Sequence, residues 1–182
     1  FSSDDLSRTE MYKANAERAK QEASFADYGD YLRSLEMKAE IKPFAPLYMS
    51  RIAQLTNKSN QFNLTTKRYT DADVRSFIEK GWKIYCISVA DKFGDNGITG
   101  CIMINPNDNA NLNANLNLNK GKSVEIDTFL LSCRILGKGI EVAFIKKILS
   151  LLKEGGVETV RAEYLPTEKN VQVKDFYEKF GF

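Results

Sequence analysis

Residues 125–156 constrain the fold more than any other stretch, because they join a strand pattern to a helix pattern through a glycine-containing turn. Residues 125–131 predict a buried strand, since apolar side chains lie on both of its faces. Residues 140–152 predict a helix, since their apolar side chains recur at helical spacing. Two glycines at 155–156 supply a left-handed end to that helix. A buried strand leading into a helix indicates an α/β protein.

The turn between them has the sequence RILGKG at 134–139, an R-x-x-G-x-G pattern. Gly137 and Gly139 let the backbone approach a ligand closely, and a helix N-terminus presents unpaired amides and a positive dipole end. Phosphate or pyrophosphate suits such a site. The turn lacks the G-K-[ST] of a Walker loop, and Val142 stands where a Rossmann fingerprint needs a third glycine. A plain packed turn is the alternative.

A second motif, N-x-x-V-x-x-F-Y-x-x-F-G-F, runs from Asn170 to Phe182 after a predicted strand. The two motifs in this order resemble those of the GNAT superfamily of acyl-CoA N-acyltransferases. The resemblance implies an α/β fold with a mixed sheet flanked by helices. It also implies that the first motif holds the pyrophosphate of coenzyme A or phosphopantetheine. Asn170 and Tyr177 would then lie beside the thioester sulfur.

Composition excludes several classes of protein. The 182 residues allow one ordinary domain with an appendage. A net charge of +2 does not indicate a nucleic-acid-binding surface. No apolar run approaches the roughly 20 residues of a membrane span, and no signal peptide is evident. Three cysteines without a C-x-x-C indicate reduced thiols in a cytoplasmic protein. Because histidine is absent, proton transfer would need Tyr, carboxylates, Cys or water.

The remaining sequence predicts the other elements of a mixed α/β sheet. Residues 60–66 are dense in amides and hydroxyls, and predict either a self-capping loop or a polar ligand or interface loop. Residues 105–120 are Asn-rich and predict a mobile insertion. Residues 91–97 predict a long hairpin turn. Helices are predicted at 1–23, 24–35, 47–57, 70–80, 140–154 and from 170 onward, and strands at 38–44, 82–90, 98–104, 125–131 and 157–164.

Several segments are similar to a narrower group, the C-terminal half of FkbH-like proteins, which join a HAD-type (haloacid-dehalogenase) domain to a GNAT-like domain. The matching segments are RTEMYKANAER, NQFNLTTKRY, DKFGDNG, IDTFLLSCRILGKGIE, AEYLPTEKN and DFYEKFGF. The resemblance implies an acyl-carrier protein as partner and the loading of a glyceryl-type acyl unit. Residues 1–37 would be a helical connector to a missing N-terminal HAD-type domain, and 38–182 the GNAT-like domain. The Asn-rich insertion departs from the family pattern, and the closing strand or strands after Phe182 are expected to be missing.

Candidate binding residues follow from the two motifs. A phosphate group would contact the backbone amides of the turn, and the Arg134 side chain would neutralise it. No cluster of carboxylates indicates a metal site. The candidate cofactor-binding residues are Arg134, Ile135, Leu136, Gly137, Lys138, Gly139, Ile140 and Asn170.

Three residues are candidates for catalysis. Cys133 adjoins the turn, where a helix N-terminus would favour the nucleophilic thiolate, and could carry the acyl group. Tyr177 could protonate a leaving thiolate, as its match in the resembling family does, and Asp127 is a candidate base. The alternatives are a buried structural thiol for Cys133, a core aromatic for Tyr177 and a surface or capping role for Asp127. Cys86 and Cys101 fall in apolar strands and are expected to be inert.

Two functional classes remain open. In the first, the domain is an acyltransferase that uses Cys133 or Tyr177. In the second, it is a non-catalytic module that docks the pantetheine arm of a carrier protein for a neighbouring HAD-type domain. The absence of histidine and of an obvious strong base favours the second class more than the family resemblance alone would.

Overall fold

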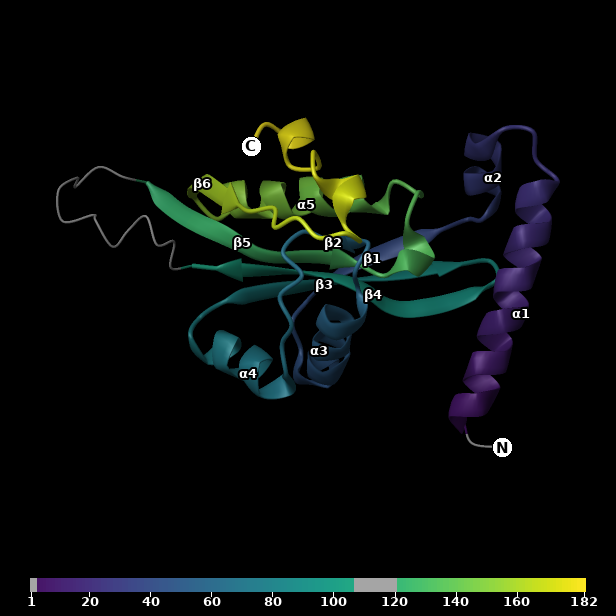
Figure 1. Cartoon of the computed structure of the whole chain (residues 1–182), viewed down its shortest axis with the longest axis horizontal. Helices are drawn as coiled ribbons and strands as arrows, with labels where there is room; N and C mark the ends of the chain where they lie inside the picture. Colours follow the sequence, from purple (N-terminus) through teal and green to yellow (C-terminus); the bar gives the residue numbers. More distant parts are fainter. Residues whose placement is uncertain (1–2, 107–120) are drawn as a thin grey trace. The chain divides into compact units, whose positions relative to one another are not determined.

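The structure is a computed structural model and describes residues 3–106 and 121–182. Its strands form one sheet in the order β1-β3-β4-β5-β2, with β6 also pairing with β5 (Figure 1). This is the mixed sheet flanked by helices that the sequence predicted. The strands are β1 (Lys38–Pro43), β2 (Phe62–Asn63), β3 (Lys83–Asp91), β4 (Gly94–Asn105), β5 (Lys122–Leu131) and β6 (Val157–Ala162). Most of the Asn-rich insertion lies outside the described residues.

The chain divides into two compact units, of which the larger comprises Ile41–Ile87 and Ile98–Phe182. Within it, α3 (Met49–Lys58) and α4 (Asp71–Glu79) lie on one face of the sheet (Figure 1). On the other face lie α5 (Ile140–Glu154) and the C-terminal segment (Figure 1). A shared core joins α3 and α4 to the strands. It contains Ile52, Ala53, Leu55, Val74, Ile84, Cys86, Cys101, Met103 and Leu130.

The free edge of β5 is shared between two strands. β6 runs parallel to its first half, from Lys122 to Ile126. β2 runs antiparallel to its end, at Leu130 and Leu131. Residues 60–66 therefore contribute a strand to the sheet as well as a loop, which differs from both sequence interpretations of this segment. Asp127 lies at the point where β6 leaves the edge, so the elements that surround it come from distant parts of the chain.

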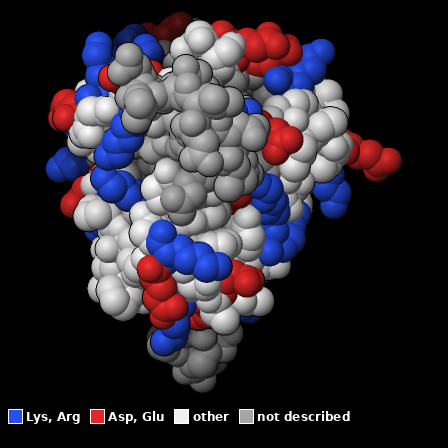
Figure 2. Space-filling model, turned by 90° about the vertical axis from the view of Figure 1, so that its left-hand side faces the viewer, with Lys and Arg blue, Asp and Glu red and all other residues white. Residues whose placement is uncertain are grey.

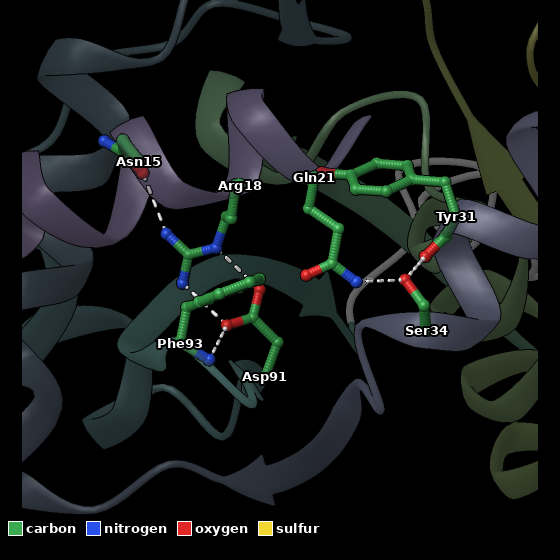
Figure 3. A network of polar contacts seen from close by, with 7 residues as sticks. All are labelled: Asn15, Arg18, Gln21, Tyr31, Ser34, Asp91 and Phe93. Carbon is green, nitrogen blue, oxygen red and sulfur yellow. Dashed lines mark hydrogen bonds and ion pairs between the residues drawn. The ribbon is translucent and has the colours of Figure 1, made fainter. Parts of the chain in front are cut away.

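The smaller unit comprises the chain up to Glu40 together with Ser88–Gly97. Its helices are α1 (Ser3–Ala23) and α2 (Tyr28–Ser34). Arg18 on α1 forms a two-pronged ion pair with Asp91, with N–O distances of 2.7 and 2.8 Å (Figure 3). Gln21 donates to the Ser34 hydroxyl at 2.6 Å. The smaller unit thus combines the helical segment with the tip of the β3–β4 hairpin, whereas the sequence analysis placed a domain boundary after residue 37. Its role as a connector stays a prediction.

Several predicted boundaries differ from those in the structure, and two of the differences have clear local causes. α2 begins at Tyr28, because Asp27 accepts the Asp30 amide at 2.9 Å and caps it, whereas the Ser24 hydroxyl donates to the Gln21 carbonyl. The hairpin turn between β3 and β4 is also shorter than residues 91–97. β4 already begins at Gly94, whose φ of 155° suits glycine. Both differences come from local capping and turn chemistry.

The C-terminal segment is not the predicted helix. It forms two short 3₁₀ helices, η4 (Val171–Val173) and η5 (Glu178–Phe180). β-branched valines weaken a helix, and a stretch this short is marginal as an α-helix in any case. Aromatic packing holds the segment instead, since the Phe176 ring lies 5.2 Å from that of Phe62 and 5.4 Å from that of Phe129.

The distribution of charged and apolar side chains bears on what the protein can bind. On the face drawn in Figure 2, Lys and Arg side chains lie among Asp and Glu side chains, in keeping with the net charge of +2. In the described ranges, no helix combines the length and apolar character needed to cross a membrane. Those ranges also contain no group of three or more Cys, Asp or Glu side chains placed to hold a metal ion.

Candidate functional site

The glycine turn has the conformation that an anion site requires. After β5, a short 3₁₀ helix, η3 (Cys133–Ile135), leads into the turn. Gly137 and Gly139 have φ angles of 74° and 75°, in the left-handed region that favours glycine. Gly139 is the N-cap of α5 and offers no side-chain cap, so the first amides of that helix depend on another partner. A Cβ at Gly139 would meet no atom within 4 Å, which leaves space beside these amides.

The predicted turn residues divide into two groups. The Ile135 amide donates to the Ser132 carbonyl at 3.2 Å, and the Leu136 amide donates to the Cys133 carbonyl at 3.4 Å. These two amides are therefore engaged within η3. The amides that begin α5, at Ile140 and just after it, lie at the positive end of the helix dipole. A bound phosphate would contact this second group, so the N-terminal half of the turn serves mainly to shape the backbone.

A hollow opens beside this helix N-terminus. We call it the apolar slot; its volume is about 230 Å³. The Oε2 atom of Glu141 is buried and has no hydrogen-bond partner within residues 3–106 and 121–182. A buried acceptor left unpaired is costly, so this atom suits an N–H group of a ligand. The slot is lined by Phe62, Leu136, Gly137, Glu141, Val142, Gln172, Val173, Phe176, Lys179 and Phe180.

A second hollow adjoins the other end of the turn. We call it the basic cavity; its volume is about 570 Å³. Cys133 and Arg134 form part of its wall, and both are exposed. It shares no lining residue with the apolar slot. The basic cavity is lined by Arg51, Leu55, Lys58, Ser59, Asn60, Gln61, Leu131, Ser132, Cys133, Arg134 and Lys169.

Asp127 is held in a network of buried polar groups. Its side chain is 9% exposed, and its Oδ1 lies 2.7 Å from Lys67 Nζ. The Tyr69 and Thr128 hydroxyls both donate to Oδ2 at 2.8 Å. Burial, and then the hydrogen bond to Asp127, raise the pKa of Tyr69, so this hydroxyl keeps its proton. A role for Asp127 as a base stays a prediction, and it would need one of these partners to move.

The Tyr177 hydroxyl is buried and has no hydrogen-bond partner in the described part of the chain. The residue is 7% exposed, and its ring packs against those of Phe176 and Phe182. Burial, and then the charge of Asp127, raise the pKa of Tyr177. The side chain therefore keeps its proton at neutral pH and offers it to no protein group. Its predicted role as a proton donor is compatible with this placement but is not tested by it.

Asn170 has a clear structural role. It is fully buried, and its Nδ2 donates to the Asn63 and Leu165 carbonyls, both at 2.9 Å. Its Oδ1 accepts from the Thr167 amide at 2.7 Å and the Tyr164 hydroxyl at 3.2 Å. Both amide protons are thus used inside the protein. Asn170 fastens the loop after β6 to β2, and its predicted place beside a thioester stays a prediction.

The three cysteines are all free thiols, and they differ in exposure. Cys86 and Cys101 are buried, as the sequence predicted. Burial raises the pKa of Cys86 to about 12 and the pKa of Cys101 well above its ordinary value, which suits inert thiols. Cys133 is exposed, so the alternative of a buried structural thiol is wrong. Its nucleophilic role stays a prediction.

Sequence reasoning missed four residues that the structure brings to these sites. Lys67 and Tyr69 reach Asp127, Glu141 contributes an unpaired atom to the apolar slot, and Arg51 enters the basic cavity. One local signal was available for the first pair, because positions two apart in an extended segment lie on the same side. For Arg51 and Glu141, helical periodicity alone gives no sign of function.

Comparisons with known proteins agree with this architecture. A family model described as the Acetyltransferase (GNAT) family matches residues 49–182. Similar solved structures include an acetyltransferase from Trypanosoma brucei, with 17% identity over 80% of this chain and 92% of that chain, and a TM-score of 0.52. Glucosamine-6-phosphate N-acetyltransferase from Arabidopsis thaliana has 21% identity over 80% and 91%, with a TM-score of 0.53.

A third similar structure is that of AAC(6')-Iy in complex with the bisubstrate analogue CoA-S-monomethyl-acetylneamine. It has 11% identity over 80% of this chain and 90% of that chain, and a TM-score of 0.56. At such identities the likeness shows the fold alone. A comparison with curated proteins gave no match. Because the family model covers most of the chain, including the glycine turn, the chain belongs to the acetyltransferase (GNAT) family.

Proposed function

We propose that this chain is an acyltransferase-type domain that binds the pantetheine arm of coenzyme A or of an acyl-carrier protein at the apolar slot. It takes part in the transfer of a small, glyceryl-like acyl unit. The observation that carries the proposal is the slot itself. There the left-handed Gly137, Glu141 with its unpaired buried Oε2, and Val142 in the first turn of α5 line one hollow, just after the uncapped start of that helix.

The residues of the slot fit such an arm chemically. Phosphate oxygens suit the first amides of α5, and a pantetheine amide N–H suits Glu141 Oε2. Phe62, Val142 and Phe176 supply apolar walls for the methylene groups between them. When bound, the arm supplies the acyl thioester. The chain supplies binding and orientation from these residues.

Three side chains are the proposed chemical groups. The Tyr177 hydroxyl has no hydrogen-bond partner within residues 3–106 and 121–182, so Tyr177 is the proton donor. Asp127, which is paired with Lys67, is the proton acceptor. Cys133, the exposed thiol, would accept the acyl group. Its Sγ would give up its proton to Asp127 and form the new thioester as the bond to the pantetheine sulfur breaks, and the released pantetheine thiolate would take the Tyr177 proton. The acyl-carrier protein and a HAD-type domain of the same polypeptide are the proposed partners, on the strength of the FkbH-like segments. Three free thiols support a cytoplasmic setting.

One observation favours the alternative of a non-catalytic docking module. Burial and the charge of Asp127 raise the pKa of Tyr177, and a strongly raised pKa makes a poor proton donor near neutral pH. In that case the slot would bind the pantetheine arm for a neighbouring domain, and no acyl adduct would form. The two functions share the binding step and differ in the chemistry that follows it.

Calorimetric titration with coenzyme A tests the binding step. Gly139→Asp places a Cβ and a carboxylate beside the α5 amides, and we expect affinity to fall at least about tenfold. Gly156→Asp is the matched control, since Gly156 also has a positive φ, of 79°, and open space around it, but lies beyond the other end of α5. Equal affinity in the two variants would contradict the site.

Intact-protein mass spectrometry after incubation with acyl thioesters separates the two functions. An adduct that disappears in Cys133→Ala and persists in Cys86→Ala and Cys101→Ala supports transfer through Cys133. An adduct that persists in Cys133→Ala contradicts that assignment. Coenzyme A binding without any adduct favours the docking module.

A further inference from the structure

The lining of the basic cavity carries several cationic side chains and no acidic one. Four of its lining residues are Arg51, Lys58, Arg134 and Lys169, and none is Asp or Glu. On the face drawn in Figure 2, by contrast, the two signs of charge are mixed. Like charges around one hollow repel each other, so their grouping raises the free energy of the folded protein unless an anion is present. The lining therefore favours a negatively charged ligand.

Arg51 is the most constrained of these cations. It is half-buried, its Nε donates to the Ile98 carbonyl at 3.0 Å, and its Nη1 donates to Gln54. Burial, and then the charge of Arg134, lower the pKa of Arg51. Neither Arg51 nor Lys58 nor Lys169 lies within ion-pair distance of a carboxylate in residues 3–106 and 121–182. Their charges are thus available to a ligand.

Neutral donors complete the cavity. Ser59, Asn60, Gln61 and Ser132 add hydroxyl and amide groups to its wall. Arg68 fixes this wall, because its guanidinium donates to the Ser59 carbonyl at 2.9 Å and to the Asn60 side chain. Cations with several neutral donors around them are the usual surroundings of bound phosphate or carboxylate.

The basic cavity and the apolar slot are neighbours that open separately. Three chain segments contribute to both hollows. In the first, Gln61 lines the cavity and Phe62 lines the slot. In the second, Arg134 lines the cavity and Leu136 lines the slot. In the third segment, Lys169 lines the cavity and Gln172 the slot. The two hollows therefore lie along the same three chain segments. That arrangement suits two substrates of one transfer reaction.

We propose that the basic cavity is a subsite for the phosphate or carboxylate group of an acyl acceptor, separate from the phosphates of the pantetheine arm. The inference rests on the proposed function in one respect, namely that the neighbouring slot takes the thioester arm. The cavity selects an anionic acceptor, and it holds that acceptor beside Cys133 and the glycine turn. The binding of an anion can be measured without any transfer reaction.

The test is a calorimetric titration of inorganic phosphate, at constant ionic strength, into the free protein and into the protein saturated with coenzyme A. We expect Lys58→Gln and Lys169→Gln each to weaken phosphate binding about threefold, and the double variant about tenfold. Lys146→Gln and Lys147→Gln are controls, because these exposed lysines on α5 line neither hollow. Because Arg51 also anchors α3 to Ile98, the lysine variants decide the outcome.

Saturable phosphate binding that persists with coenzyme A bound, and that weakens only in the cavity variants, supports the proposal. Mutual exclusion of phosphate and coenzyme A would overturn it, since the anion would then be a phosphate of the arm. Absence of binding, or equal weakening in the controls, would overturn it as well. If phosphate binds in the cavity while coenzyme A fails to bind, the proposed function fails and the anion site stands.

Discussion

Two buried aspartates, one in each compact unit, are paired with cations in different ways. Asp91 receives the fork of Arg18, and side-chain exposure is 1% for the acid and 9% for the base. Its Oδ1 also accepts the Phe93 amide at 3.0 Å. Asp127 forms an ion pair with the ammonium of Lys67, whose side chain is 32% exposed. Its other carboxylate oxygen accepts hydrogen bonds from two hydroxyl groups.

The difference indicates a fixed charge in one unit and an adjustable one in the other. Planar guanidinium and backbone donors hold Asp91 in one geometry and supply no proton that could move. Hydroxyl donors around Asp127 can rotate, and the unpaired hydroxyl of Tyr177 lies close enough for its pKa to respond to the carboxylate. The Arg18–Asp91 pair is therefore expected to stabilise structure, and the Asp127 network is expected to support chemistry.

The largest expected effect concerns the first pair. Arg18→Met leaves the Asp91 charge buried without its partner, and we expect a loss of about 3–5 kcal/mol in the stability of the smaller unit. Lys67→Met should cost about 1–2 kcal/mol, because Lys67 is a third exposed and Asp127 keeps its hydroxyl donors. Guanidinium unfolding, with hydrogen exchange in α1, measures both.

A double variant is the control for this first prediction. Arg18→Met with Asp91→Leu replaces the ion pair by apolar contacts, and it should recover most of the lost stability. If Arg18→Met costs no more than Lys67→Met, the two pairs are energetically equivalent and the contrast between them is wrong. That outcome would also make α1 a loosely attached helix.

The next effect is on the rate of transfer. Asp127→Asn keeps the shape and most hydrogen bonds of the side chain but removes its ability to take a proton. We expect acyl transfer from acetyl-CoA, followed as release of coenzyme A, to fall about 10²-fold. Asp91→Asn should leave the rate unchanged in protein that remains folded. Equal rates in wild type and Asp127→Asn would remove Asp127 from the mechanism.

Local pattern was enough to predict the glycine turn and the helix after it. The apolar spacing from Ile140 onward gave α5, and the left-handed Gly156 ends that helix as the sequence predicted. The helix predicted at 70–80 also has a local basis, since Thr70 and Asp73 form a capping box whose two hydrogen bonds span three residues. Each of these features depends on residues that are near each other in the sequence.

The networks that define the sites could not be predicted in this way. Lys67 and Asp127 are 60 residues apart, and Arg18 and Asp91 are 73 apart, so only the folded sheet brings them together. The C-terminal segment shows the opposite limit, because its aromatic motif fits a helix while tertiary packing holds two 3₁₀ turns. Propensity is a weak guide where long-range contacts decide.

A matched pair of tyrosine variants sharpens the comparison within the Asp127 network. Tyr69→Phe removes a hydroxyl that donates to a buried carboxylate, and we expect a loss of about 1.5–3 kcal/mol. Tyr177→Phe removes a buried hydroxyl that has no hydrogen-bond partner in the ranges 3–106 and 121–182, and we expect a gain of about 1 kcal/mol. Urea unfolding at neutral pH measures both. If Tyr177→Phe destabilises the protein, the Tyr177 hydroxyl has a hydrogen-bond partner in solution. Its proton is then already engaged, which contradicts the proposed role of Tyr177 as proton donor.

The last prediction separates burial from charge pairing, because burial is the cause of the raised pKa of the Cys86 thiol. Burial raises its pKa from 9.0 to about 12. Below pH 9 the thiol is protonated in both states, so its contribution to stability is constant. Above pH 9 the unfolded chain loses this proton and the folded chain keeps it, so stability falls as the pH rises toward 12. The loss should reach about 1.4 kcal/mol at pH 10.

Urea unfolding at pH 8 and pH 10 should therefore show a smaller alkaline loss in Cys86→Ala than in wild type. Cys133→Ala, at an exposed thiol, should match wild type, and a loss unchanged in Cys86→Ala would show that the buried thiol does not carry it.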